Sequence, residues 1–280
     1  MKIVVTGANG QLGREVAVQG QGCHELILLG HHDLDIGEGK AVLDFFKRER
    51  PDALINCAAY TNVDQAEADF DGAFRVNAIG AQNLAVACLE FGAKLVHVST
   101  DYVFDGSGSA SYREYDQVSP LGVYGKTKLI GENMVREIVG WHFIVRTAWL
   151  YGDGNNFVRT MLRLSESNQT LRVVKDQIGT PTSTVDVTKA IFKLLESNAY
   201  GTYHATCQGQ CSWYDFAVEI FKQANKKITV IPVSSEEFPR PAKRPAYSVL
   251  DNYMLKMTVG DPMRNWQESL TDYLNHEAKR

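Results

Sequence analysis

The sequence predicts an α/β fold: a doubly wound parallel sheet of the Rossmann type, joined to a smaller mixed α/β lobe. Two observations predict it. Short segments that are apolar throughout alternate with helical segments over the first half of the chain, as in a parallel sheet covered on both faces. The first of these segments leads into a glycine-rich turn at residues 7–13 and then into a helix, which is the order of a βαβ unit.

In this first half, strands and helices are expected to alternate. The expected strands are residues 3–5, 26–29, 53–56, 94–98 and 142–145. The expected helices are residues 11–19, 40–49, 70–90 and 126–138. Pro51 lies just beyond the second helix and ends it. The βαβ order predicts right-handed crossovers between parallel strands.

The pattern after residue 146 is less regular. Helices are expected at residues 155–167, 184–197 and 265–276 and from Ser212 onward, with strands at residues 172–174, 200–204 and 228–232. Thr184 should cap one helix, and Ser212 with Asp215 should form an acidic variant of the capping box on another. We expect a dinucleotide-binding domain at residues 1–150, with a returning segment near 173–200, and mainly a substrate-binding lobe at residues 151–280.

Composition narrows the function classes. The chain has 280 residues and a net charge of −4, with 44% hydrophobic and 22% charged residues, so it offers nucleic acid no extended basic surface. No apolar run is long enough to span a membrane, and the N-terminus lacks a secretory-signal pattern, so we expect a cytoplasmic protein. The five cysteines are scattered without a zinc-binding pattern, and no metal site is expected from them.

The glycine-rich turn predicts a dinucleotide site. Gly7 allows a tight turn, Gly10 lets the backbone approach a pyrophosphate, and Gly13 allows the helix to pack closely on the strand. The helix that follows offers free N–H groups and the positive end of its dipole to the anion. A plain tight turn is the alternative interpretation.

The end of the second strand bears on the choice of cofactor. Residues 29–33 have the sequence LGHHD, with no carboxylate directly at the strand end to bind the ribose 2′-OH of NAD(H). His31 or His32 could instead face a 2′-phosphate, although a solvated loop explains these two histidines equally well. NADP(H) is therefore the preferred cofactor, and NAD(H) is the alternative.

A hydroxyl, a phenol and an ammonium form the candidate catalytic set. Thr100 ends an apolar strand, and Tyr124 and Lys128 lie one helical turn apart, so their side chains share one face. Tyr124 would be the general acid, with a pKa that the Lys128 ammonium should lower, and Thr100 would hold a carbonyl oxygen. An ordinary pair on a helix surface is the alternative interpretation of Tyr124 and Lys128.

Several segments together resemble a known family. They are residues 7–13, 99–106 (STDYVFDG), 120–128 (PLGVYGKTK), 146–149 (RTAW) and 176–182 (DQIGTPT). The chain is similar over nearly its whole length to the dTDP-4-dehydrorhamnose reductases, a family of extended short-chain dehydrogenases/reductases. This resemblance implies NADPH-dependent reduction of the C4 ketone of dTDP-4-dehydro-β-L-rhamnose to dTDP-β-L-rhamnose, a step of nucleotide-sugar biosynthesis.

The resemblance also implies roles for individual residues. The catalytic residues would be Thr100, Tyr124 and Lys128. The cofactor would contact Gly7, Asn9, Gly10, Gln11, Leu12, Asp35, Ile36, Ala59, Tyr60, Thr61, Val98, Tyr124 and Lys128. The nucleotide sugar would contact Thr100, Asp101 and Trp149, with Asn156, Gln177 and Arg244 as weaker candidates for the dTDP end. A solvated charge on a loop is the alternative interpretation of Arg244.

Some features leave alternatives open. Certain members of the family bind a divalent metal through glutamates at a dimer interface; Glu15 matches one position, but residues 183–186 lack the second glutamate. A magnesium requirement therefore stays open, as does the choice between monomer and homodimer. The alternative functions are another sugar-nucleotide reductase or epimerase of the superfamily, and a non-catalytic regulatory subunit that binds a dinucleotide.

Overall fold

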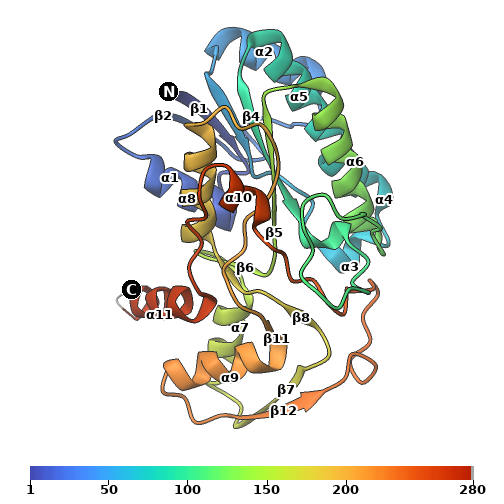
Figure 1. Cartoon of the computed structure of the whole chain (residues 1–280), viewed down its shortest axis with the longest axis vertical. Coiled ribbons are helices and arrows are strands. Elements are labelled where there is room, and N and C mark those ends of the chain that lie inside the picture. Colours follow the sequence, from blue (N-terminus) through green and yellow to red (C-terminus); the bar gives the residue numbers. More distant parts are fainter. Residues whose placement is uncertain (279–280) are drawn as a thin grey trace.

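A parallel sheet of six strands forms the centre of the molecule, and helices cover both of its faces (Figure 1). The structure is a computed structural model that describes residues 1–278. The strand order across the sheet is β10-β5-β4-β3-β1-β2, and every neighbouring pair is parallel. The strands are β1 (Lys2–Thr6), β2 (Glu25–Leu29), β3 (Ala53–Asn56), β4 (Lys94–Thr100), β5 (His142–Thr147) and β10 (Gly201–His204).

Alternate side chains of each strand pack against opposite helical layers. Ile3 and Val5 belong to the core that contains α1 (Gln11–Gly20) and α8 (Thr184–Leu195), whereas Val4 belongs to the opposite core. The helices of that second layer are α2 (Gly39–Glu49), α5 (Gly80–Phe91) and α6 (Val123–Ile138). Burial on both faces explains the uninterrupted apolar runs at residues 3–5 of β1 and 53–55 of β3, and it confirms the predicted fold class.

The helix expected at residues 70–90 contains a widened turn. It consists of α4 (Phe70–Phe74), the π-helical segment η1 (Arg75–Ile79) and α5. Asn77 lies in the π-helical segment, where its side chain accepts from the Tyr60 N–H at 2.9 Å and donates to the Thr127 hydroxyl at 3.1 Å. The widened turn therefore joins the loop after β3 to the helix that carries Tyr124 and Lys128.

The rest of the chain forms a smaller group of elements at the carboxyl ends of the main strands (Figure 1). Its helices are α7 (Phe157–Leu164), α9 (Trp213–Gln223) and α11 (Trp266–Glu277), whereas α10 (Tyr253–Met257) packs against β10 of the main sheet. Its paired strands are β7 (Thr170–Val174) with β12 (Thr229–Val233), β6 (Leu150–Tyr151) with β9 (Thr182–Ser183), and β8 (Ile178–Gly179) with β11 (Cys211–Ser212). Two further short helices, α3 (Val63–Ala66) and η2 (Asp101–Val103), follow β3 and β4.

The two helix caps predicted in this part of the chain have different outcomes. Ser212 and Asp215 form the expected reciprocal capping box on α9. The cap predicted for α8 is wrong by one residue, because Ser183 occupies the N-cap position and its hydroxyl accepts from the Val185 N–H. Ser183 has the extended backbone that an N-cap requires, whereas Thr184 already lies in the helix.

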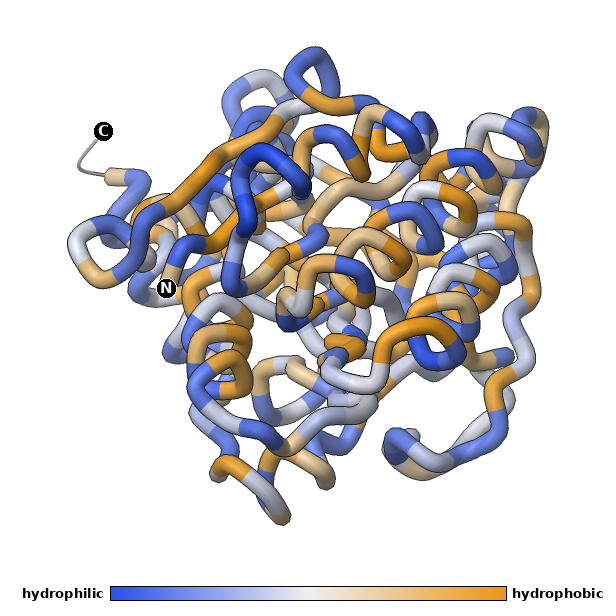
Figure 2. The backbone as a smooth tube through the Cα atoms, turned by 90° about the horizontal axis from the view of Figure 1, so that it is seen from above, coloured by the Kyte–Doolittle hydropathy of each residue, from blue (hydrophilic) through white to orange (hydrophobic). Residues whose placement is uncertain are grey.

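The chain returns to the main sheet late in the sequence. Helix α8 packs against α1, and β10 then pairs in parallel with β5 at the edge of the sheet. In Figure 2, hydrophobic stretches run through the middle of the molecule, and hydrophilic stretches occupy many of the outer turns. Within the described part of the chain, no helix is both long enough and apolar enough to cross a membrane.

Candidate active site

Two adjoining cavities open at the carboxyl ends of the parallel strands, where ligands bind in sheets of this type. Their volumes are about 480 and 470 Å³. Gly10, Cys57, Ala59 and Thr61 line both cavities, so the two form one elongated groove across the start of α1.

The glycine-rich turn supplies the floor of this groove. Gly7 has a φ of +67°, and a Cβ added there would lie 2.6 Å from the Ala58 nitrogen. A Cβ on Gly13 would lie 2.4 Å from the carbonyl oxygen of Gly7. Gly10 is the N-cap of α1, and neither a capping side chain nor an acidic residue occupies the first turn. The helix N–H groups are therefore left for an anion, as a dinucleotide pyrophosphate requires.

The second cavity has a charged outer wall. Asp35 accepts from the Gly37 N–H at 2.8 Å and pairs with Arg75 at 2.8 Å, and the same guanidinium pairs with Glu38 at 2.7 Å. His31 and His32, both exposed, line this cavity beside Asp35. This end of the groove thus presents one carboxylate and two imidazoles.

The first cavity brings together the three expected catalytic side chains. Thr100 lies at the end of β4, Tyr124 in the first turn of α6 and Lys128 one turn later. All three line the cavity, and the Lys128 ammonium donates to the Val98 carbonyl at 2.7 Å. The Thr100 hydroxyl donates to Asp101 at 3.0 Å.

Burial controls the acidity of this set. It raises the pKa of Tyr124 to about 12, against the smaller opposite effect of the Thr100 hydroxyl. It also lowers the pKa of Lys128 to about 8. The expectation that Lys128 lowers the pKa of Tyr124 is wrong here, because the ammonium is directed to Val98 and loss of solvent around the phenol dominates. Tyr124 therefore carries its proton at neutral pH.

Asp101 and Trp149 form another part of the cavity wall. Burial raises the pKa of the Asp101 carboxyl to about 6. Trp149 has a φ of +46°, and its ring stacks on Trp213 of α9 with centroids 3.6 Å apart. A Cβ on Gly179 would lie 2.4 Å from the Trp149 ring, which explains the glycine of the DQIGTPT segment.

The remaining predicted contacts fall into two groups. Every residue expected to contact the cofactor lines one of the two cavities. Asn156 and Arg244 line neither: Asn156 caps α7 through its Oδ1 atom, and Arg244 pairs with Asp64 at 2.9 Å and interacts with the Tyr102 side chain. Gln177 donates to the Ser235 hydroxyl at 2.9 Å.

The region of the metal-linked glutamate also has defined contacts. Glu15 accepts from the Gln19 side chain at 2.7 Å, and the buried Asp186 pairs with Arg264 at 2.8 Å. Among residues 1–278, no group of three or more His, Cys, Asp or Glu side chains is arranged to hold a metal ion.

Sequence reasoning missed three supporting features of the site. Trp213 and Asn77 carried no local signal, because each acts on a segment far away in the sequence. The third is a buried ion pair between α6 and β5, in which Glu132 accepts from both Nε and Nη2 of Arg146, at 2.9 and 2.7 Å, and from the hydroxyl of Ser99 in β4. Glu132 lies one turn after Lys128, so helical spacing was an available signal.

Comparison with known proteins identifies the family. The family model described as RmlD substrate binding domain matches residues 1–279. The chain is 40% identical to a dTDP-4-dehydrorhamnose reductase of Aggregatibacter actinomycetemcomitans, over 96% of this chain and 97% of the relative. This chain belongs to the dTDP-4-dehydrorhamnose reductase family. A 43% identical protein of Bacillus subtilis, the spore coat polysaccharide biosynthesis protein SpsK, matches over 99% of this chain and 98% of its own length.

Solved structures of this family have the same fold. A dTDP-4-dehydrorhamnose reductase from Clostridium acetobutylicum superposes with a TM-score of 0.98 at 53% identity, covering 99% of this chain and 100% of that one. A dTDP-4-dehydrorhamnose reductase from Bacillus anthracis, solved in complex with NADP, superposes with a TM-score of 0.96 at 44% identity. The match covers 98% of this chain and 99% of that one. The Bacillus anthracis relative therefore binds NADP with the same fold as this chain.

Proposed function

We propose that this chain reduces the C4 ketone of dTDP-4-dehydro-β-L-rhamnose to dTDP-β-L-rhamnose with NADPH. The observation that carries the proposal is the convergence of Thr100, Tyr124 and Lys128 in a cavity continuous with the glycine-rich turn. Full-length similarity to reductases of this substrate supports the choice of sugar nucleotide.

Each member of the set has a distinct task. A bound dihydronicotinamide supplies the hydride. The phenol of Tyr124 supplies the proton to the ketone oxygen, and its raised pKa keeps that proton available at neutral pH. The Thr100 hydroxyl, free to turn from Asp101, holds the same oxygen. Lys128, anchored at Val98 on the cavity wall, orients the cofactor ribose.

The sugar nucleotide would extend from this point toward the smaller group of elements. Asp101 would bind sugar hydroxyls, and the Trp149 ring would also contact the substrate from the cavity wall. Arg244 would bind the pyrophosphate, exchanging its ion pair with Asp64 for charge-assisted hydrogen bonds. Asn156 would act at the dTDP end by fixing the start of α7.

NADPH is the preferred cofactor of this proposal, and NADH is the alternative. His31 and His32 line the second cavity where the adenosine ribose of a dinucleotide would lie, and no carboxylate directly follows β2. Asp35 lies farther along the chain and is already paired with Arg75. The NADP complex of the Bacillus anthracis relative supports the same choice.

Turnover with enzymatically prepared dTDP-4-dehydrorhamnose tests the proposal. NADPH and NADH are compared in parallel, each with and without magnesium, and the sugar product is identified by chromatography. We expect one NADPH oxidised for each sugar reduced. Conversion of a sugar nucleotide without net oxidation of the dinucleotide would instead support an epimerase, and dinucleotide binding without any turnover would support the regulatory alternative.

A further inference from the structure

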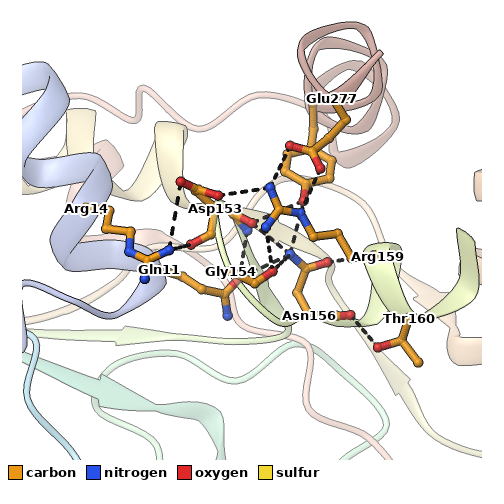
Figure 3. Close-up of polar contacts among 10 residues, drawn as sticks. Gln11, Arg14, Asp153, Gly154, Asn156, Arg159, Thr160 and Glu277 are labelled. Atoms are coloured by element: carbon orange, nitrogen blue, oxygen red, sulfur yellow. Dashed lines mark hydrogen bonds and ion pairs between the residues drawn. The ribbon is translucent and has the colours of Figure 1, made fainter. Parts of the chain in front are cut away.

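The side chain of Gln11 links the groove to the smaller group of elements. Gln11 is the first residue of α1, and it lines the first cavity. Its side-chain oxygen accepts from the backbone N–H of Gly152 at 2.9 Å and from Nδ2 of Asn156 at 3.3 Å. One residue therefore contributes to the anion-binding helix start and also holds the loop at residues 152–156 (Figure 3).

Asn156 fixes that loop from within. Its Nδ2 atom donates to the carbonyls of Gly152 and Gly154, at 2.7 and 3.1 Å, and its Oδ1 atom accepts from the Arg159 N–H at 3.0 Å. The loop and the start of α7 are thus one hydrogen-bonded unit, and Gln11 is bonded to that unit from α1 (Figure 3).

Arg159 extends the unit to the last helix. Its guanidinium pairs with Asp153 at 2.9 Å and with Glu277 of α11 at 2.7 Å, and it donates to the Gly154 carbonyl at 3.2 Å (Figure 3). Arg14 adds a second, longer link from α1, with 3.5 Å between its Nη1 atom and the Asp153 carbonyl oxygen. Displacement of the loop would therefore move α7 and α11 as well.

The same loop directly follows the cavity wall. Trp149 and Leu150 line the first cavity, and β6 ends at Tyr151, immediately before Gly152. Trp149 is also stacked on Trp213 of α9. Gln11 is thus linked to the indole of Trp149 by one hydrogen bond to Gly152 and by the three peptide bonds between Gly152 and Trp149.

We propose that Gln11 is a positioning residue that couples dinucleotide binding at the start of α1 to the arrangement of the loop at residues 152–156 and of Trp149. An anion on the helix N–H groups fixes the backbone of Gln11, and the fixed side chain then holds the loop in the arrangement that suits the sugar nucleotide. The identity of the second ligand rests on the proposed function. Linkage requires that each ligand strengthen binding of the other by the same factor.

Calorimetry of three proteins tests the coupling. The affinity of thymidine diphosphate is measured with and without saturating NADP⁺ for the wild type, Gln11→Met and Gln11→Glu. Binding at one site typically changes the affinity of a coupled site about 5- to 150-fold. We expect bound NADP⁺ to increase the affinity of the wild type for thymidine diphosphate at least about fivefold. Gln11→Met keeps the side-chain length but removes the acceptor, so the coupling factor should fall to about two or less. Gln11→Glu keeps an acceptor oxygen and should retain the coupling factor, while its charge in the first turn of α1 lowers the affinity for NADP⁺ itself, so NADP⁺ is raised until this variant is saturated. Wild-type coupling below this range, or an unchanged factor in Gln11→Met, would overturn the proposal.

Hydrogen exchange with NADP⁺ alone gives a second readout that needs no sugar nucleotide. We expect NADP⁺ to slow amide exchange at residues 150–157 in the wild type and in Arg14→Ala, whose contact is the longer one, but not in Gln11→Met. Equal protection in Gln11→Met would refute the coupling. Because this measurement depends only on the dinucleotide, failure of the reductase assay with normal loop protection would refute the proposed function and leave the role of Gln11 standing.

Discussion

The rings of Trp149 and Trp213 lie face to face, with centroids 3.6 Å apart and planes inclined by 8°. Trp149 lines the cavity in which we propose that the sugar nucleotide binds, and its backbone φ is +46°, so its position depends on support from the neighbouring ring. Truncation in Trp213→Ala removes that support. We expect KM for the sugar nucleotide to rise about two- to twelvefold, the equivalent of ~0.5–1.5 kcal/mol for an aromatic pair, with a smaller change in kcat.

Steady-state kinetics with Trp213→Phe provide the matched control. Phenylalanine keeps a stacking ring, so KM should return toward the wild-type value. A KM unchanged in Trp213→Ala, at a wild-type melting temperature, would show that Trp149 holds its position without the stack.

Replacement of the phenol tests the proton donor. Tyr124→Phe removes one hydroxyl from the cavity while keeping the ring that contacts Tyr102 edge to face. We expect kcat to fall at least about a hundredfold, the usual contribution of a general acid, with little change in the affinity for NADPH. Stopped assays over long incubations and a fluorescence titration of NADPH measure the two quantities. Wild-type turnover in this variant would contradict the role given to Tyr124.

The alkaline limb of the pH profile should come from Lys128. Its pKa is lowered by burial to about 8, whereas that of Tyr124 is raised to about 12, so the lysine is the member of the pair that titrates first as pH rises. Loss of the ammonium charge weakens its hold on the cofactor. We therefore expect kcat/KM for NADPH, which reports groups of the free enzyme, to fall above about pH 8.

The residual activity of Tyr124→Phe separates the two groups. The alkaline limb should persist in this variant, because the lysine that produces it is still present. If kcat/KM of Tyr124→Phe did not fall above about pH 8, the titrating group would be Tyr124 instead.

The sequence predicted strands best where helices cover both faces of the strand. Residues 3–5 of β1 and 53–55 of β3 are apolar throughout because helices cover both faces, and this pattern located the strands closely. The two-residue strands β6, β8, β9 and β11 were missed, because so short a segment has no periodicity of its own. The π-helical turn at Asn77 was missed for a related reason: it lies inside a segment whose composition is helical throughout.

The site residues that could be predicted are likewise those that belong to a local sequence pattern. Gly7, Gly10, Tyr124 and Lys128 could be found because each belongs to a spacing that one turn or one helix fixes. Trp213 reaches the site only through tertiary packing, so no local spacing predicts it. The direction of the Tyr124 pKa shift was mispredicted because spacing shows which charges are near but not how much solvent is excluded.

A buried carboxyl that serves a substrate should reduce the stability of the protein, and Asp101 provides a test. Burial raises its pKa from 3.8 to about 6, so the folded protein holds this proton more tightly, and the stabilisation is present at low pH and lost as pH rises from about 4 to 6. Asp101→Asn keeps an oxygen that can accept from Thr100 but carries no charge. We expect its free energy of unfolding in urea to exceed that of the wild type by roughly 1–3 kcal/mol at neutral pH and to match it near pH 4, while kcat/KM for the sugar nucleotide falls. A stability difference that does not change with pH would show that the carboxyl titrates as it would in water.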